Sequence, residues 1–262
     1  MIAVCLKWLA EPGAPGDERF GGISLADEAA LELALQHGEL LGTEVVAVSC
    51  GGPESITALR QALARGAARA ARVDAPASLD SAAVARSLAT VVADATFVWC
   101  GDVSADRGSG SVPAFLAARL GARQALGVVD VTLGDGAAVE AVRRLDGGRR
   151  EVLRATAPCV VSVEGGVARL RRAGLAATLR AADAPIDETV PDRAPEHAPA
   201  GVVRPYRPRA RALAAPHGDT LGRLRQLTDA GGAPTHGERV TLDPPAAAAR
   251  IVAALREWGY LP

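Results

Sequence analysis

A glycine- and serine-rich loop is the part of the sequence best suited to binding a ligand. Residues Gly101–Pro113 (GDVSADRGSGSVP) lie between a short apolar run, Thr96–Cys100, and an apolar-periodic run, Ala114–Leu120. This order predicts a strand, a loop and a helix. Backbone N–H groups and hydroxyls at a helix N-terminus, where the helix dipole favours negative charge, suit an anion. We therefore expect a phosphate or pyrophosphate to bind at this loop.

A second candidate for binding chemistry is Lys7, the single lysine among 29 basic residues. Lysine provides a compact point charge, whereas arginine provides a planar fork. One interpretation is a codon-biased source that kept one lysine. The other is a site at the end of the first strand that needs a point charge.

Apolar runs alternate with helical spacing from residue 1 to residue 125. The expected strands and helices are, in order, Ile2–Leu6, Ser24–Gly42, Glu44–Ser49, Glu54–Gly66, Arg69–Val73, Ser78–Asp94 and Thr96–Cys100. Strands that alternate with helices of this length join through right-handed crossovers into a parallel sheet. The sequence therefore predicts an α/β fold with a mostly parallel sheet flanked by helices.

The carboxyl ends of the expected strands are Cys5–Trp8, Cys50–Gly52 and Cys100–Gly101. Ligands of parallel sheets bind beyond these ends, and the start of the first helix, Ser24–Asp27, lies on the same side. We expect these four segments to meet in one crevice beside the glycine-rich loop. The four cysteines form no C-x-x-C pair, so buried free thiols are expected instead of a zinc site.

The second half of the chain is organised differently. Further strands are expected, with a hairpin turn at Asp146–Gly148, and an arginine-rich loop with a possible short helix follows at Gly165–Leu179. The expected strands are Val128–Leu133, Val139–Leu145, Glu151–Ala155 and Cys159–Val163. The expected domains are an α/β nucleotide-binding domain (residues 1–182), an extended proline-rich arm (183–216) and a C-terminal segment (217–262).

The C-terminal segment is expected to end in a helix that begins at Asp243 and stops at Gly259. Its apolar residues Ile251, Leu255 and Trp258 share one face, and a helix beyond a long arm needs a surface to pack on. A second polypeptide is one candidate for that surface.

Catalytic and metal-binding patterns are missing from the crevice segments. None contains histidine, and the chain has no G-x-S-x-G elbow, Walker loop, strict G-x-G-x-x-G or metal-ligand spacing. We therefore expect no catalytic residue and no metal, and a crevice that holds a ligand without transforming it.

Composition narrows the class of protein. The 262 residues carry a net charge of −1 and only 3% aromatic residues, which disfavours nucleic acid and anionic membrane as partners. No apolar run approaches the roughly 20 residues of a membrane span. The short apolar N-terminus fits a first strand better than a signal peptide, so a cytoplasmic location is expected.

Several segments, in order, resemble the beta subunit of the electron transfer flavoproteins. They are CLKW (5–8), SLADEAALELAL (24–35), EVVAVSCGGP (44–53), ALRQALARGAARAARV (58–73) and RRLDGGRREVLRATAPCVVSVEGG (143–166). The stretches CGDVSADRGSGSVPAFLAARLGA and SVEGGVARLRRA further resemble the branch associated with mycofactocin. The resemblance covers roughly residues 1–180.

This resemblance implies a Rossmann-like fold of the adenine nucleotide alpha hydrolase-like type. It also implies a heterodimer with an alpha subunit that holds or shares FAD, while the beta subunit binds AMP or a second FAD. Electrons would come from a flavin-dependent or mycofactocin-linked dehydrogenase. Matched positions assign partner contacts to Arg171, Arg172 and Leu175. The nucleotide-binding residues implied are Cys5, Lys7, Ser24, Leu25, Ala26, Asp27, Cys50, Gly101, Asp102, Val103, Ser104, Asp106, Arg107, Gly108, Ser109, Gly110, Ser111 and Val112.

The loop departs from the family pattern, although Asp106 matches it. Where the family commonly has lysine, a second acid, glutamine and glycine, this chain has Asp102, Gly108, Ser111 and Pro113. Losing a lysine weakens phosphate binding, and Arg107 offers a replacement charge. AMP, FAD or no ligand are thus the alternatives for this site. The stretch ARLRR (168–172) replaces the family's Asn-Glu-Pro-Arg-Tyr run and indicates a different electron donor.

Two other functions compete with an electron carrier. A stand-alone adenine-nucleotide-binding module of the stress-sensor type would bind ATP without flavin, but it leaves the long arm unexplained. An ATP-pyrophosphatase needs a phosphate loop directly after the first strand. The segment LAEPGAPG (9–16) lacks the serine and glycine cluster of such a loop.

Overall fold

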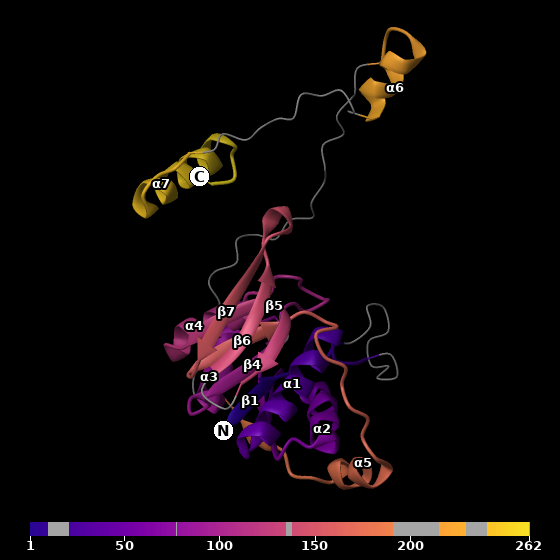
Figure 1. The fold of residues 1–262 in the computed structure, drawn as a ribbon, viewed down its shortest axis with the longest axis vertical. Helices are drawn as coiled ribbons and strands as arrows, with labels where there is room; N and C mark the ends of the chain where they lie inside the picture. Colours follow the sequence, from indigo (N-terminus) through magenta and orange to yellow (C-terminus); the bar gives the residue numbers. More distant parts are fainter. Residues whose placement is uncertain (10–20, 77, 135–137, 191–214, 229–239, 262) are drawn as a thin grey trace. The chain divides into compact units, whose positions relative to one another are not determined.

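A computed structural model describes residues 1–9, 21–76, 78–134, 138–190, 215–228 and 240–261 of the chain. The chain divides into two compact units, Met1–Val202 and Val203–Pro262. The first unit contains the sheet and its helices, and the described residues of the second include helices α6 and α7 (Figure 1).

The described part of the first unit forms a nine-stranded sheet in the order β7-β6-β5-β8-β4-β1-β2-β3-β9. All neighbours are parallel except the pairs β5–β6 and β6–β7, which are antiparallel. The predicted mostly parallel α/β sheet is therefore confirmed. The strands are β1 (Ile2–Cys5), β2 (Val45–Gly51), β3 (Arg69–Asp74), β4 (Phe97–Gly101), β5 (Arg123–Leu133), β6 (Ala138–Arg144), β7 (Arg150–Thr156), β8 (Cys159–Val163) and β9 (Asp187–Thr189).

Helices cover both faces of this sheet (Figure 1). Successive residues of β1 point to opposite faces: Ile2 and Val4 pack in the cluster with α1 and α2, whereas Ala3 and Cys5 pack with α3 and α4. This double burial explains why β1 is apolar throughout. The helices of the first unit are α1 (Leu25–Leu41), α2 (Ile56–Arg65), α3 (Ser81–Val92), α4 (Val112–Leu120) and α5 (Leu175–Ala182).

The start of α1 is fixed by its cap, and this cap sets the position of a candidate binding residue. Ser24 is the N-cap, and its hydroxyl accepts a hydrogen bond from the backbone N–H of Asp27 at 3.0 Å. The helix ends at Gly42, which has a φ of 59°, so both predicted boundaries agree with the structure. Asp27 is thereby held in the first turn, facing the ends of β1 and β4.

Two sheet elements differ from the expectation. Strand β5 begins at Arg123 instead of Val128, because a bulge at Gly127 (φ 63°) interrupts the apolar pattern without ending the strand. Strand β9 lies inside the stretch 183–216 that was expected to be an extended arm. It pairs with β3, and residues 191–214 of that stretch lie outside the described residues.

Strand β9 is held by charge as well as by backbone pairing. The guanidinium of Arg72, with a side chain 8% exposed, contacts Asp74 at 2.6 Å and Glu188 of β9 at 3.2 Å. The sequence did not predict β9, because its three residues have no apolar periodicity. The strand forms by pairing with β3, which lies more than a hundred residues earlier in the chain.

The second unit contains α6 (Thr220–Thr228) and α7 (Pro244–Glu257). Asp243 caps α7 as predicted, since its carboxylate accepts from the N–H of Ala246 at 2.9 Å. No residue of α7 is buried within the described chain, and Ile251 and Trp258 are 60% and 68% exposed. Helix α6 was not predicted.

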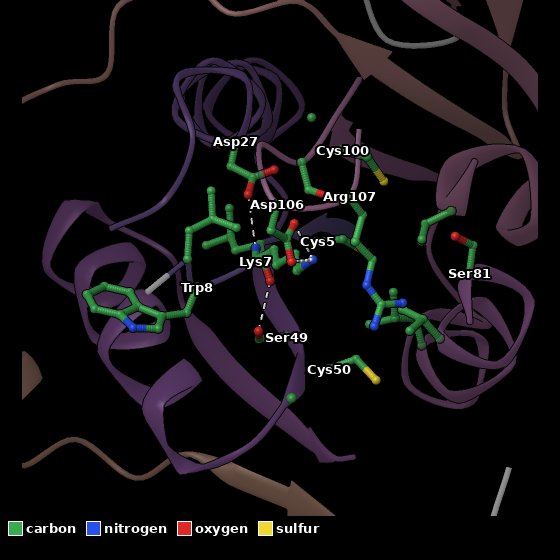
Figure 2. A pocket seen from close by; sticks show the side chains of 18 of the residues that line it. Cys5, Lys7, Trp8, Asp27, Ser49, Cys50, Ser81, Cys100, Asp106 and Arg107 are labelled. Carbon is green, nitrogen blue, oxygen red and sulfur yellow. Dashed lines mark hydrogen bonds and ion pairs between the residues drawn. The ribbon is translucent and has the colours of Figure 1, made fainter. Parts of the chain in front are cut away.

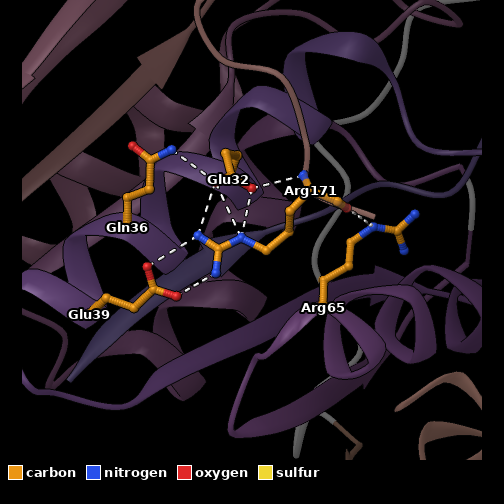
Figure 3. Close-up of polar contacts among 5 residues, drawn as sticks. All are labelled: Glu32, Gln36, Glu39, Arg65 and Arg171. Atoms are coloured by element: carbon orange, nitrogen blue, oxygen red, sulfur yellow. Dashed lines mark hydrogen bonds and ion pairs between the residues drawn. The ribbon is translucent and has the colours of Figure 1, made fainter. Parts of the chain in front are cut away.

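One charge network ties the loop that precedes α5 to α1 (Figure 3). The guanidinium of Arg171 donates to the carboxylate of Glu32 at 3.0–3.2 Å and also to Glu39. The backbone N–H of Arg171 reaches Glu32 at 2.9 Å, and Gln36 donates to Glu32 at 2.8 Å. Burial alone would raise the pKa of Glu32, but hydrogen bonds from Arg171 and Gln36 outweigh it and lower that pKa.

We predict that Arg171→Ala lowers the free energy of unfolding by about 2 kcal/mol, because the Glu32 carboxylate, 7% exposed, loses its charged partner. Arg171→Lys should recover only part of this loss, since lysine cannot form the fork that spans both glutamates. Urea unfolding monitored by circular dichroism measures the difference. The control is Arg172→Ala, an exposed neighbour expected to change stability by less than about 0.5 kcal/mol. Equal losses in both alanine variants would contradict the network.

Candidate ligand-binding site

A cavity of about 350 Å³ lies at the carboxyl ends of β4, β1 and β2 (Figure 2). Its walls come from the ends of these strands, the first turn of α1, the start of α3 and the loop 101–113. This is the edge where parallel sheets bind ligands, and the volume falls in the range of small-molecule sites. The structure thus brings together the crevice segments expected from the sequence.

A salt bridge links the first strand to the glycine-rich loop. The ammonium of Lys7 lies 2.5 and 2.7 Å from the two carboxylate oxygens of Asp106 (Figure 2). Burial would raise the pKa of Asp106, but hydrogen bonds from Lys7 and Ser104 outweigh it and lower that pKa. Both side chains are more than 40% exposed, so the pair adds little to global stability. Its effect is local, because it joins the middle of the loop to the end of β1.

Asp27 connects three elements at the back of the site. Its carboxylate, in a residue 7% exposed, accepts the backbone N–H of Lys7 at 3.0 Å and also that of Gly101. A Cβ at position 101 would lie 2.5 Å from this carboxylate, so the close approach requires glycine. Burial raises the pKa of Asp27 to about 7 despite these hydrogen bonds. Near neutral pH this carboxyl is therefore divided between its two protonation states.

Three thiols form one part of the cavity wall. Cys5 and Cys100 are register partners on β1 and β4, and Cys50 lies near the end of β2. All are free, as expected. Burial raises the pKa of Cys50 to about 11, while a hydrogen bond with Cys5 and burial raise the pKa of Cys100. Neutral thiols are poor nucleophiles, so Cys50 and Cys100 act as small apolar wall groups.

The loop itself is folded back against its neighbours. The N–H of Asp102 donates to the carbonyl of Val163 at 3.0 Å, and the guanidinium of Arg107 donates to the carbonyl of Leu79. At Gly110, φ is 57° and a Cβ would lie 2.5 Å from the Asp102 carbonyl oxygen, so glycine is required there. Ser109 lies 3.4 Å from Ser81, measured between hydroxyl oxygens.

Most of the residues expected to bind a nucleotide line this cavity. Four do not: Ser24 caps α1, Leu25 is 73% exposed, Ala26 is buried next to Gly101, and Gly108 is exposed in the loop. Those that line it are Cys5, Lys7, Asp27, Cys50, Gly101, Asp102, Val103, Ser104, Asp106, Arg107, Ser109, Gly110, Ser111 and Val112.

The sequence did not single out the residues of α3 and of the turn before it. Leu79, Ser81, Val84 and Leu88 line the cavity, together with Glu54 after β2. A signal was available, because Asp80 caps α3 and places the start of that helix at the carboxyl edge of the sheet.

The expected partner contacts have different environments. The Arg171 side chain is engaged within the chain by Glu32 and Glu39. Arg172 is exposed, and Leu175 and Leu179 are 76% and 62% exposed on α5. These two leucines are one helical turn apart and share a face.

No histidine among the described residues lines the cavity. His37 is fully buried beside Phe97, with ring centroids 4.6 Å apart, and does not line the cavity. His197 and His236 lie outside the described residues. Among the residues that the structure does describe, no group of three or more His, Cys, Asp or Glu could hold a metal ion. Within the same residues, no helix combines the length and apolar character needed to cross a membrane.

Known proteins share this sequence pattern. Residues 17–194 match the family model described as the electron transfer flavoprotein domain. The electron transfer flavoprotein subunit beta of Methylophilus methylotrophus is 33% identical over 189 residues, which cover 69% of this chain and 72% of that protein. Protein FixA of Bradyrhizobium diazoefficiens is 33% identical over 168 residues, covering 60% of this chain and 58% of FixA. The electron transfer flavoprotein subunit beta of Syntrophomonas wolfei is 31% identical over 173 residues, which cover 62% of this chain and 68% of that protein.

The buried carboxyl of Asp27 should make stability depend on pH. Its folded pKa of about 7 exceeds its ordinary value of 3.8, so the folded chain keeps a proton that the unfolded chain releases. Stability therefore falls as pH rises from about 4 to about 7 and levels off above. Between pH 5 and pH 8 this titration should lower the free energy of unfolding by about 2 to 3 kcal/mol. We predict that Asp27→Asn abolishes this part of the decrease.

Urea unfolding at pH 5, 6, 7 and 8 measures this dependence. The control is Asp106→Asn. The pKa of Asp106 is lowered, so this residue titrates below the pH range of the experiment. The free energy of unfolding of this variant should therefore change with pH as it does in the unmodified protein. If the free energy of unfolding of Asp27→Asn depends on pH as strongly as that of the unmodified protein, the pKa of Asp27 is not raised and the prediction is wrong.

The raised pKa of Cys50 predicts slow alkylation. At pH 8 a thiol with a pKa of about 11 is about 0.1% thiolate, so iodoacetamide should react on the order of a hundredfold more slowly with the native protein than in urea. Peptide mass spectrometry at several times measures the rate. The rate should rise about tenfold per pH unit from pH 7 to pH 9.5. A plateau near pH 8.5 would mean an ordinary thiol that is merely shielded.

Proposed function

Since the chain belongs to the electron transfer flavoprotein domain family, we propose that it is the beta subunit of a heterodimeric electron carrier. The proposed partner is an electron transfer flavoprotein alpha subunit, and the proposed cofactor is FAD, held by or shared with that subunit. When bound, FAD supplies the electron chemistry. The observation that carries the proposal is the cavity itself: a ligand-sized site at the carboxyl edge of the sheet, in which the described residues form no group of three or more side chains that could hold a metal ion.

The cavity lining supports an adenosine moiety as its occupant, from AMP or from FAD. Apolar side chains, among them Leu79, Val84 and Leu88, offer surfaces for a flat base, and Ser81 offers a hydroxyl for a ribose. The chain would hold and orient this group and exclude water from it, with no bond made or broken.

Exposed apolar residues of the second unit support a subunit partner. On α7 and just after it, Ile251, Trp258 and Tyr260 are 60%, 68% and 75% exposed. On α6, Leu221 and Leu227 are 54% and 64% exposed. Helices gain most of their stability from packing an apolar face, so two such helices need a surface to cover them. We propose that the alpha subunit supplies it.

The electron donor that we propose is a dehydrogenase linked to mycofactocin. The support is the resemblance of the loop 100–122 and of residues 162–173 to the mycofactocin-associated branch. We assign its contact to the exposed Leu175 on α5, next to Arg172. The Arg171 side chain has its own partners on α1 and serves to position this segment.

We predict that co-expression with the alpha-like subunit yields a yellow heterodimer with about one FAD released per dimer on denaturation. Chromatography of the denatured extract counts FAD and AMP, and size exclusion with light scattering gives the mass. Trp258→Asp should abolish co-purification, because it places a charge on the face that the partner covers. Leu40→Asp changes a leucine of α1 that is 52% exposed and should leave the complex intact. A colourless monomer that binds ATP would instead identify a stand-alone nucleotide-binding module.

A further inference from the structure

Two cysteines of the cavity wall lie directly opposite each other on neighbouring strands. Cys5 ends β1, and the parallel register pairs it with Cys100 on β4. Both side chains lie on the same face of the sheet, because they pack in one cluster with α3 and α4. Register neighbours in a sheet have Cα atoms about 4.8 Å apart, inside the range of about 4.4–6.8 Å found for disulfides. The fold therefore holds two free thiols at a separation that a disulfide can span.

The two thiols are already in contact. They share a hydrogen bond that, ahead of burial, raises the pKa of Cys100. A hydrogen bond raises the pKa of its donor because it stabilises the protonated form, so the Cys100 thiol donates and the Cys5 sulfur accepts. The accepting sulfur can release its own proton without losing this contact, whereas the donor cannot. Cys5 is thus the sulfur that can react first, and Cys100 lies next to it for a second step.

The cavity gives a small oxidant access to this pair. Cys5 and Cys100 are 9% and 4% exposed, and both line the cavity of about 350 Å³ (Figure 2). Hydrogen peroxide is nearly as small as water, and a cavity of this volume holds molecules of that size. The wall therefore shields the two sulfurs from large reagents but leaves them open to peroxide.

The other two cysteines are not placed for the same bond. Cys50 lies two residues beyond Val48, which is the register partner of Cys5 on β2. Two residues of strand and one strand spacing put the Cα atoms of Cys5 and Cys50 about 8 Å apart, beyond the reach of a disulfide without backbone movement. Cys159 lies on β8 and does not line the cavity. The geometry thus favours one pairing among the four thiols.

We propose that Cys5 and Cys100 form a modification site, which hydrogen peroxide oxidises to a disulfide in the cavity wall. The Cys5 thiol releases its proton to water, and its sulfur attacks one peroxide oxygen. The O–O bond breaks, a sulfenic acid forms, and the leaving hydroxide takes up a proton to become water. The Cys100 sulfur then attacks the Cys5 sulfur, the S–O bond breaks, and the hydroxyl group leaves as a second water with the Cys100 proton. Two thiols lose two electrons, which reduce one peroxide to two waters.

The new bond would join β1 to β4 close to the place where Asp27 links them, since that carboxylate accepts the N–H groups of Lys7 and Gly101. The proposal concerns the wall of the cavity alone. It does not depend on which ligand the cavity holds or on a role in electron transfer.

Peptide mass spectrometry of the full chain tests the proposal. The folded protein is treated with hydrogen peroxide, quenched with catalase, unfolded in urea and alkylated, so that every remaining thiol is marked. The number of free thiols should fall from four to two. A cross-linked pair of peptides that contain Cys5 and Cys100, lighter by two hydrogens, should appear before reduction. Dithiothreitol should restore all the thiols.

Single variants assign the two steps. Cys5→Ala should abolish the cross-link and leave Cys100 as a thiol. Cys100→Ala should stop the reaction at a sulfenic acid on Cys5, which dimedone labels. The matched control is Cys50→Ala, which removes another thiol of the same wall and should leave the yield of the cross-link unchanged. If either of the first two variants does not fold, the cross-link in the unmodified protein decides.

Oxidation in urea separates a pair built by the fold from random pairing. Cys5 is nearer along the chain to Cys50 than to Cys100, so the unfolded chain should give mixed disulfides. A Cys5–Cys50 link in the folded protein, or four thiols recovered after peroxide treatment, would overturn the proposal. A chain that forms the cross-link but binds neither nucleotide nor alpha subunit would contradict the proposed function and leave this site standing.

Discussion

The site depends on one buried carboxylate. Asp27 accepts the N–H groups of Lys7 and Gly101, and so fixes the first turn of α1 against the carboxyl ends of β1 and β4. Such a group is stable in the interior only because these donors satisfy its oxygens, and its raised pKa shows that burial still outweighs them. The same contact requires glycine at position 101, where the loop leaves the sheet.

The chemistry of the site follows from this frame. The backbone N–H of Lys7 donates to Asp27, and the Lys7 ammonium contacts Asp106 in the loop. Thiols, serines and apolar side chains of α3 complete the walls. The role that we propose for this cavity is to hold and orient a flat group such as adenine. That combination suits a subunit that positions a cofactor and leaves electron transfer to the flavin.

The sequence predicted what depends on local pattern. The cap at Ser24, the stop at Gly42, the apolar β1 and the loop after β4 all appear where residue type and spacing placed them. Features set by distant contacts were missed: β9 depends on pairing with β3 and on Arg72, and the α3 wall of the cavity depends on how that helix crosses the sheet. Arg171 lies in an arginine-rich segment that was expected to be a loop, and its contact with Glu32 depends on the three-dimensional fold.

The most direct test of an adenosine-binding site in a two-subunit carrier is an experimental structure of the chain with its alpha subunit, crystallised with AMP. The account predicts density for the adenosine moiety between the Cys5–Lys7 segment and the start of α3. Density for FAD should lie mainly in the alpha subunit. A cavity without ligand would contradict the account.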